Sequence, residues 1–256
     1  MKQEVLKAKI KERYGKIALE GNSESCCGPE CCSSTEADPQ MSSVVVGYDG
    51  KTLESIPKSS ILGLGCGAPI NFANLKIGEI VVDLGSGAGI DAFLASREVK
   101  DSGKVIGIDF TDEMLHKATS TAKENGFTNV EFRKGDIEDS IPVDDNSVDV
   151  AISNCVINLA TDKVKTFKEI YRILKKDGKG RMIISDLVTS KEVRGDSVNP
   201  EDWCSCIDGA LTKENYINSI KEAGFSDVKT LNEQIYITEY KTNRIITSVV
   251  IGATAK

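Results

Sequence analysis

The chain has 256 residues and a formal net charge of −7, and this length allows one large α/β domain with a smaller appended region. The negative charge argues against a nucleic-acid-binding protein, which normally carries a basic face to neutralise phosphates. The first residues lack the apolar core of a signal peptide, and no stretch approaches the roughly 20 apolar residues of a membrane span. We therefore expect a cytoplasmic protein without nucleic-acid or membrane partners, in which the eight cysteines are thiols, metal ligands or redox partners rather than structural disulfides.

An apolar stripe near the start of the chain predicts a docking helix over residues 2–20, with Gly21 ending it. The stripe consists of Leu6, Ile10, Tyr14 and Ile17. Residues 22–43 lose this periodicity and are rich in Ser, Glu, Pro and Cys, which predicts a mobile segment.

Two vicinal cysteine pairs lie in that segment. They are Cys26, Cys27, Cys31 and Cys32. Thiolates select soft ions, so these four residues are candidate ligands. No His or second Cys pair at zinc-finger spacing follows, so a redox-labile segment without a ligand remains open.

Two glycine-rich runs follow, and only the second has the context of a cofactor loop. The first, at 62–68, places Cys66 between glycines, but no β-branched strand leads into it and Pro69 follows closely. We interpret it as a tight loop that presents Cys66. The second, within 79–91, runs from an apolar strand through Gly85, Gly87 and Gly89 into a helix, the arrangement that binds nucleotide-like cofactors.

From residue 80 onwards, predicted strands alternate with predicted helices. The strands are 80–84, 104–110, 130–133, 148–153 and 181–186, and the helices are 90–99, 112–125 and 162–175. This alternation predicts a Rossmann-like α/β fold with a mostly parallel sheet and helices on both faces.

The C-terminal part breaks this alternation. It begins with an irregular insertion at 187–210 that holds Trp203. Thr212 then caps a helix that runs to about 223, and strands are expected at 234–237 and 245–253. We expect three regions, at 1–43, 44–186 and 187–256.

Asp109 strengthens the assignment of the second glycine run to a cofactor. It ends the next strand 20 residues beyond Gly89, where an acidic side chain accepts hydrogen bonds from a ribose diol. These residues predict a nucleoside cofactor.

The motifs at 81–89, Asp109, 135–137 and 153–154 resemble those of class I S-adenosylmethionine methyltransferases. The resemblance implies this fold and S-adenosyl-L-methionine as the cofactor. It assigns the methionine part to the loop of Asp83, Gly85, Ser86 and Gly87, the ribose to Asp109, the adenine edge to Asp136 and Ile137, and the surroundings of the methyl sulfonium to Asn154.

Three cysteine-bearing motifs are similar to those of arsenite methyltransferases. They are IPKSSILGLGCGAP at 56–69, SNCVINL at 153–159 and WCSCIDGAL at 203–211. The resemblance implies methyl transfer to trivalent arsenic, as arsenite or methylarsenite and their thiol conjugates, in detoxification. Cys66, Cys155 and Cys206 would hold the arsenic, the C-terminal region would help to bind it, and an external thiol reductant such as thioredoxin or glutathione would act as a partner.

The chemistry fits this residue set. Trivalent arsenic is thiophilic, and its lone pair attacks a methyl group without a general base, so the only histidine, His116, needs no catalytic role. Burial alone is a poor explanation for Cys66 and Cys206 in glycine-rich loops, and the insertion around Cys206 could close over the site as a lid. Cys204 remains open as a spare thiol, a disulfide partner or a competitor of Cys206.

Two alternatives remain. One is a methyltransferase of a small organic acceptor such as a quinone or sterol precursor, although no base is evident near Asn154. The other is a non-enzymatic, thiol-rich metal-binding protein on a retired scaffold, against which the intact Asp83, Gly85, Gly87 and Asp109 argue.

Overall fold

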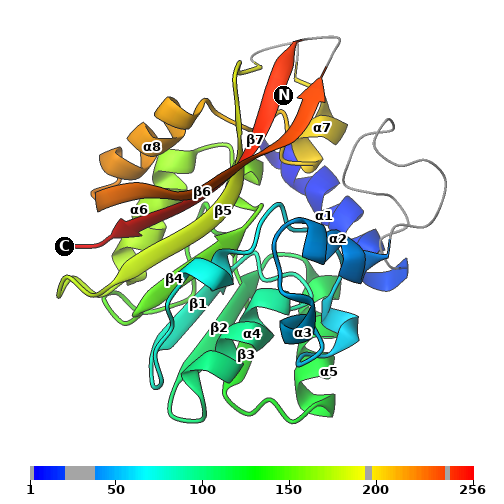
Figure 1. Cartoon of the computed structure of the whole chain (residues 1–256), viewed down its shortest axis with the longest axis vertical. Helices are drawn as coiled ribbons and strands as arrows, with labels where there is room; N and C mark the ends of the chain where they lie inside the picture. The colour runs from blue at the N-terminus through cyan, green and yellow to red at the C-terminus, as the bar shows by residue number, and fades with distance from the viewer. Residues whose placement is uncertain (1–2, 21–37, 194–197, 240–242) are drawn as a thin grey trace.

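A seven-stranded sheet forms the centre of the molecule, with strand order β3-β2-β1-β4-β5-β7-β6 (Figure 1). The structure is a computed structural model and describes residues 3–20, 38–193, 198–239 and 243–256. The strands are β1 (Ile80–Leu84), β2 (Lys104–Asp109), β3 (Val130–Lys134), β4 (Val150–Asn154), β5 (Arg181–Thr189), β6 (Ser226–Glu239) and β7 (Arg244–Thr254). The first five pair in parallel, and β7 is antiparallel to both β5 and β6.

Helices cover both faces of the sheet, as the alternating pattern predicts. Figure 1 shows α6 and α8 on one side and α4 and α5 on the other. The helices of the described residues are α1 (Gln3–Glu20), α2 (Pro39–Val45), α3 (Gly50–Leu53), α4 (Ile90–Val99), α5 (Asp112–Glu124), α6 (Lys163–Ile173), α7 (Pro200–Cys204) and α8 (Lys213–Glu222). Because both faces are covered, the central strands β1 and β4 are buried along most of their length and are mainly apolar.

The order of the central strands fixes the position of the site. The chain leaves β1 towards β2 on one side and reaches β4 on the other, so the strand order reverses between β1 and β4. Ligands of open α/β sheets bind outside the carboxyl ends of the strands at such a point. The loops after β1, β2 and β4 are therefore placed to form a binding site.

Four expectations need correction. Helix α2 lies partly within the stretch 22–43 for which a mobile segment was expected, and the Asp38 carboxylate caps it at the Gln40 amide. In the C-terminal part, β5 continues to Thr189, the insertion contains α7, and β6 begins at Ser226 instead of 234. Antiparallel pairing with β7 extends β5 through Leu187, Val188 and Thr189, and it extends β6 through largely polar residues whose side-chain pattern alone does not predict a strand.

Helix α1 confirms the expected docking helix. Leu6, Ile10 and Ile17 are buried, and Lys11 forms an ion pair with Asp112 on α5. The predicted stop at Gly21 and the vicinal pairs Cys26, Cys27, Cys31 and Cys32 lie outside the described residues.

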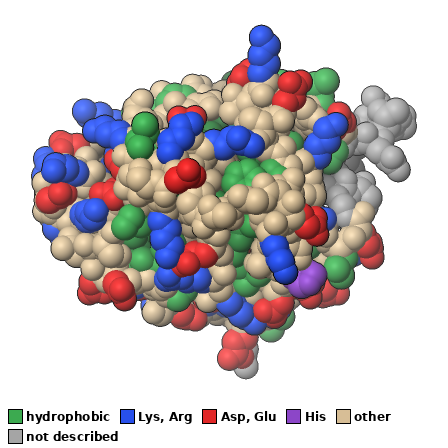
Figure 2. Space-filling view, turned by 90° about the horizontal axis from the view of Figure 1, so that it is seen from below, with side chains coloured by type: hydrophobic (Ala, Val, Ile, Leu, Met, Phe, Trp, Pro, Cys, Tyr) green, Lys and Arg blue, Asp and Glu red, His purple; other side chains and the backbone are tan. Residues whose placement is uncertain are grey.

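The surface seen from below mixes acidic and basic side chains, and its apolar groups form small, separate patches (Figure 2). None of the described helices combines the length and the apolar character needed to cross a membrane. The polar groups that could carry out chemistry gather inside the molecule, at the sheet edge described next.

Candidate active site

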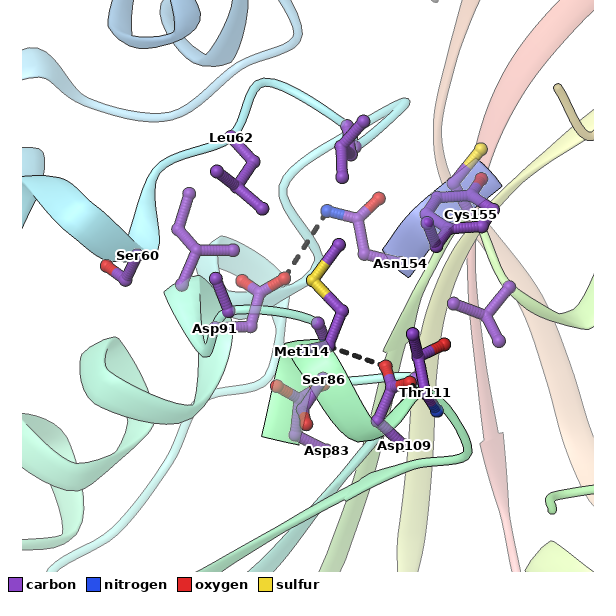
Figure 3. Close-up of a pocket in the computed structure, with 18 of the residues that line it drawn as sticks. Ser60, Leu62, Asp83, Ser86, Asp91, Asp109, Thr111, Met114, Asn154 and Cys155 are labelled. Carbon is purple, nitrogen blue, oxygen red and sulfur yellow. Dashed lines mark hydrogen bonds between the residues drawn. The ribbon is translucent and has the colours of Figure 1, made fainter. Parts of the chain in front are cut away.

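A cavity lies at the carboxyl ends of β1, β2 and β4. Its wall includes the second glycine-rich loop, Asp109 at the end of β2, and Asn154 and Cys155 at the end of β4. Figure 3 shows Cys155 at one side of this cavity and Ser60 and Leu62 at the opposite side. The first glycine-rich loop thus also lines the cavity, next to the cofactor loop.

The second glycine-rich loop turns tightly under the cavity. Gly85, Gly87 and Gly89 all have positive φ values, of 68°, 53° and 98°, which glycine adopts without steric cost. A Cβ atom on Gly85 would lie 2.3 Å from Val156. The loop is held against the end of β2 because the Gly87 amide donates a hydrogen bond to the Asp109 carboxylate at 2.9 Å.

Three buried carboxyl groups line the cavity: Asp83, Asp91 and Asp109. Burial raises the pKa of all three, to about 6 for Asp91, and the neighbouring charges of Asp91 and Asp109 further raise the pKa of Asp83. Asp83 Oδ2 and Asp91 Oδ1 have no hydrogen-bond partner among the described residues. Unpaired buried carboxylate oxygens are costly, so these atoms suit a cationic group of a ligand.

Asn154 connects the cavity to the first glycine-rich loop. Its side-chain amide donates to Gly67 O at 2.7 Å, to the Tyr48 hydroxyl at 2.8 Å and to the Asp91 carboxylate at 3.3 Å, the last drawn in Figure 3. Its Oδ1 accepts from the Cys66 amide at 3.2 Å. Asn154 therefore holds the Cys66 loop in place while it lines the cavity.

The first glycine-rich loop needs its glycines for close packing. A Cβ atom on Gly65 would lie 2.7 Å from the Asn154 amide, and one on Gly67 would lie 2.1 Å from Ser185 Oγ. Cys66 between them is fully buried at 0% exposure. The loop is tight, as expected, but the Cys66 side chain that it carries points into the protein interior.

Cys66, Cys155 and Cys206, here called the thiol cluster, come together from three separate connections. Cys206 Sγ donates to the Cys155 carbonyl oxygen at 2.9 Å. The Cys155 thiol interacts with the thiols of both Cys206 and Cys66, and these contacts, with burial, raise its pKa well above its ordinary value. For Cys206, the hydrogen bond with Cys155 lowers the pKa, but burial together with the charges of Asp186 and Cys66 outweighs it, so the pKa is also raised.

The burial of Cys66 and Cys206 corrects an expectation. Both are buried, with 0% and 1% exposure, because the loops that carry them fold onto β4, β5 and β7. Together with Leu187, Ile207 and Ile246, they form one buried group. Cys66 and Cys206 are therefore both buried and close to another thiol, so the two explanations do not exclude each other.

Two of the three cysteines have a strained backbone. Cys155 has φ 59° and Cys206 has φ 64°, a left-handed region that is uncommon for residues other than glycine and costs of the order of 1–3 kcal/mol. Such conformations persist only where the surrounding structure determines them, and they concentrate at functional sites.

Cys204 lies apart from the thiol cluster. It is buried, and its carbonyl oxygen accepts from the Tyr14 hydroxyl of α1 at 3.1 Å. Burial raises the pKa of its thiol. The contact links α1 to the segment that carries Cys206.

Asp136 and Ile137 line a second cavity, which adjoins the first through Gly85 and Asp109. Lys7 of α1 forms an ion pair with Asp136 at 2.6 Å. Helix α1 therefore covers the part of the cleft that the resemblance to class I methyltransferases assigns to the adenine edge.

Several residues of the site were not predicted from the sequence. The Tyr48 hydroxyl donates a hydrogen bond to the buried Asp91 carboxylate, and the only sequence signal for this pair is the position of Asp91 in the first helical turn after the glycine loop. Asp186, Asn158 and Lys163 lie next to the thiol cluster. The end of the predicted strand at 181–186 was the one available signal for Asp186.

Comparison with known proteins agrees with the fold. Residues 75–224 match the family described as "Methyltransferase domain". The arsenite methyltransferase of Halobacterium salinarum is 40% identical over 96% of this chain, and that of Aquipseudomonas alcaligenes is 34% identical over 90%. The chain spans 64% and 65% of the lengths of these two relatives.

A solved structure, that of CrArsM, an arsenic(III) S-adenosylmethionine methyltransferase from Chlamydomonas reinhardtii, has a TM-score of 0.66 and 29% identity. The match covers 84% of this chain and 72% of that one. The class I methyltransferase fold expected from the sequence is confirmed. Because the family match covers more than half of the 256 residues, the chain belongs to the methyltransferase-domain family.

Proposed function

We propose that this protein transfers methyl groups from S-adenosyl-L-methionine to trivalent arsenic held by Cys66, Cys155 and Cys206. The observation that carries the proposal is the meeting of these three thiols beside the cavity, with Cys155 belonging to both. Relatives named arsenite methyltransferases support it.

The residues of the cavity fit S-adenosyl-L-methionine. The unpaired oxygens of Asp83 and Asp91 suit the ammonium group of the methionine part, beside the loop of Gly85, Ser86 and Gly87. Asp109 is placed for the ribose diol, and Asp136 and Ile137 for the adenine edge. When bound, the cofactor supplies an electrophilic methyl group.

The thiol cluster serves to capture and orient arsenic. Each thiol proton leaves with a hydroxide of arsenite as water, and three As–S bonds replace three As–O bonds. The raised pKa of Cys155 keeps the empty site in the thiol form, so thiolate character arises when arsenic binds. A bound cofactor would supply its methyl group to the arsenic lone pair through cleavage of the sulfonium S–CH3 bond, leaving S-adenosyl-L-homocysteine, and the three cysteines would contribute proximity and orientation.

A reductant is needed for more than one methylation. Transfer of a methyl cation to the lone pair raises the formal oxidation state of arsenic by two, so an external thiol reductant such as thioredoxin or glutathione must supply two electrons to restore the trivalent state. This requirement suits a cytoplasmic location, where thiols stay reduced. Cys26, Cys27, Cys31 and Cys32 are candidates for gathering arsenite or for exchange with the reductant.

The proposal is tested by following arsenic speciation over time with purified protein, arsenite, S-adenosyl-L-methionine and a thiol reductant. Methylarsenic species should appear, with label from a methyl-labelled cofactor. A matched reaction without cofactor should contain arsenite alone. If the complete mixture also contains only arsenite, the proposed function is wrong.

A further inference from the structure

The carboxyl group of Asp186 lies beside the thiol cluster and has no role in the methyl transfer proposed above. The sulfur atoms of Cys66 and Cys155 and a carboxylate oxygen of Asp186 all lie within 4.8 Å of one another. Asp186 is 1% exposed. A buried carboxylate next to two thiols is a mixed set of sulfur and oxygen donors, which arsenic captured by three thiols does not need.

The hydrogen bonds of Asp186 leave room for a ligand. Its Oδ2 accepts from the Asn158 amide and the Tyr216 hydroxyl, both at 3.0 Å. Among the described residues, its Oδ1 accepts a single hydrogen bond, from the Leu187 amide at 2.9 Å. A carboxylate oxygen has two lone pairs, so Oδ1 keeps one that could bind a ligand. The hydrogen bonds to Asp186 hold its carboxylate in a fixed orientation, as hydrogen bonds to the ligating residues of metal sites do.

The charges around this group favour a divalent cation. Two thiolates and one carboxylate carry three negative charges. The buried ammonium group of Lys163 is close enough for its charge to interact with Asp186 and Cys206. The remaining two negative charges match one divalent cation, and a matched charge is what a buried site requires. Trivalent arsenic with three thiolates is already neutral and leaves the charge of Asp186 balanced by that of Lys163.

We propose that Cys66, Cys155 and Asp186 form a binding site for a divalent thiophilic cation such as Zn²⁺ or Cd²⁺. Thiolate and carboxylate are both ligands of zinc in its usual tetrahedral sites. Occupation by such a cation removes the thiols from arsenic and inhibits methylation. Only this last consequence rests on the proposed function.

The test measures Cd²⁺ binding in the full chain, with Cys26→Ser, Cys27→Ser, Cys31→Ser and Cys32→Ser introduced to remove competing thiols. Thiolate-to-metal charge-transfer absorption, without cofactor or arsenite, should report one Cd²⁺ per chain. Adding Asp186→Asn should weaken Cd²⁺ binding by about tenfold or more, while arsenite binding in the same variant stays unchanged.

Cys204→Ser is the matched control, because it removes a buried thiol outside the site and should leave Cd²⁺ affinity unchanged. Equal Cd²⁺ affinity with and without Asp186→Asn would overturn the proposal. If that variant does not fold, cadmium NMR of the parent decides, since mixed sulfur and oxygen donors support the site and sulfur donors alone contradict it. Because no methylation is measured, failure here is distinct from failure of the proposed function.

Discussion

Asp91 illustrates how burial adjusts a single carboxyl group beside the cavity. Burial raises its pKa from 3.8 to about 6, against the opposing hydrogen bonds from Tyr48 and Asn154. The folded protein therefore holds the Asp91 proton more tightly than the unfolded chain. This group stabilises the fold at low pH, and the contribution falls as the pH rises from about 4 to about 6.

We predict that Asp91→Asn removes this pH dependence. In the ligand-free protein, the free energy of unfolding of the wild type should fall relative to the variant as the pH rises through that range, because the folded protein releases the Asp91 proton at a higher pH than the unfolded chain does. Denaturant unfolding at several pH values measures the difference. A difference that stays constant with pH would show that Asp91 does not titrate in this way.

For the cysteines, the sequence predicts which residues come together but does not predict their surroundings. The motifs around Cys66, Cys155 and Cys206 indicate that the three thiols meet, and they do. The burial of Cys66 and the place of Asp186 beside it were not predictable, because both depend on how β5 and β7 pack around the loop. A strand sequence shows where a side chain lies along the strand and says nothing about which loop crosses it.

At the scale of elements, the first glycine-rich loop acts as a rigid support for Cys66. We predict that Gly67→Ala displaces the loop, because the added Cβ would lie 2.1 Å from Ser185 Oγ. Overpacking of this kind costs typically 1–3 kcal/mol. Arsenite affinity, measured by calorimetry, should fall, while cofactor affinity changes little.

Gly50→Ala is the matched control, since an added Cβ there meets nothing nearer than 3.9 Å. It should leave arsenite affinity unchanged. Unaltered arsenite binding by Gly67→Ala would mean that the position of Cys66 does not depend on this loop.

The elements that the sequence predicts well are those with strong apolar patterns. Strand β1 and helix α4 have the predicted bounds, 80–84 and 90–99. The early start of β6 was missed because Ser226–Glu239 is largely polar and exposed at a sheet edge, with register shifts against β7. Tertiary pairing, rather than local propensity, determines such a strand.

At the scale of the whole molecule, the strand order brings the cofactor cavity and the thiol cluster to one edge of the sheet. Helix α1 contacts the cavity lining through Lys7 at Asp136, and it contacts the segment that carries Cys206 through Tyr14 at the Cys204 carbonyl oxygen. The three cysteines of the thiol cluster, which are far apart in the chain, therefore depend on the same sheet for their positions.

The most direct test compares Cys155→Ser, Cys206→Ser and Cys204→Ser for methylation of arsenite and for affinity towards S-adenosyl-L-methionine. The first two should lose methylation by on the order of 100-fold or more, because a misplaced acceptor no longer meets the methyl group, and should bind the cofactor as the wild type does. Cys204→Ser should keep both properties. Unimpaired methylation by Cys155→Ser or Cys206→Ser, or loss of cofactor binding in both, would contradict the claim that these thiols hold arsenic beside the methyl donor.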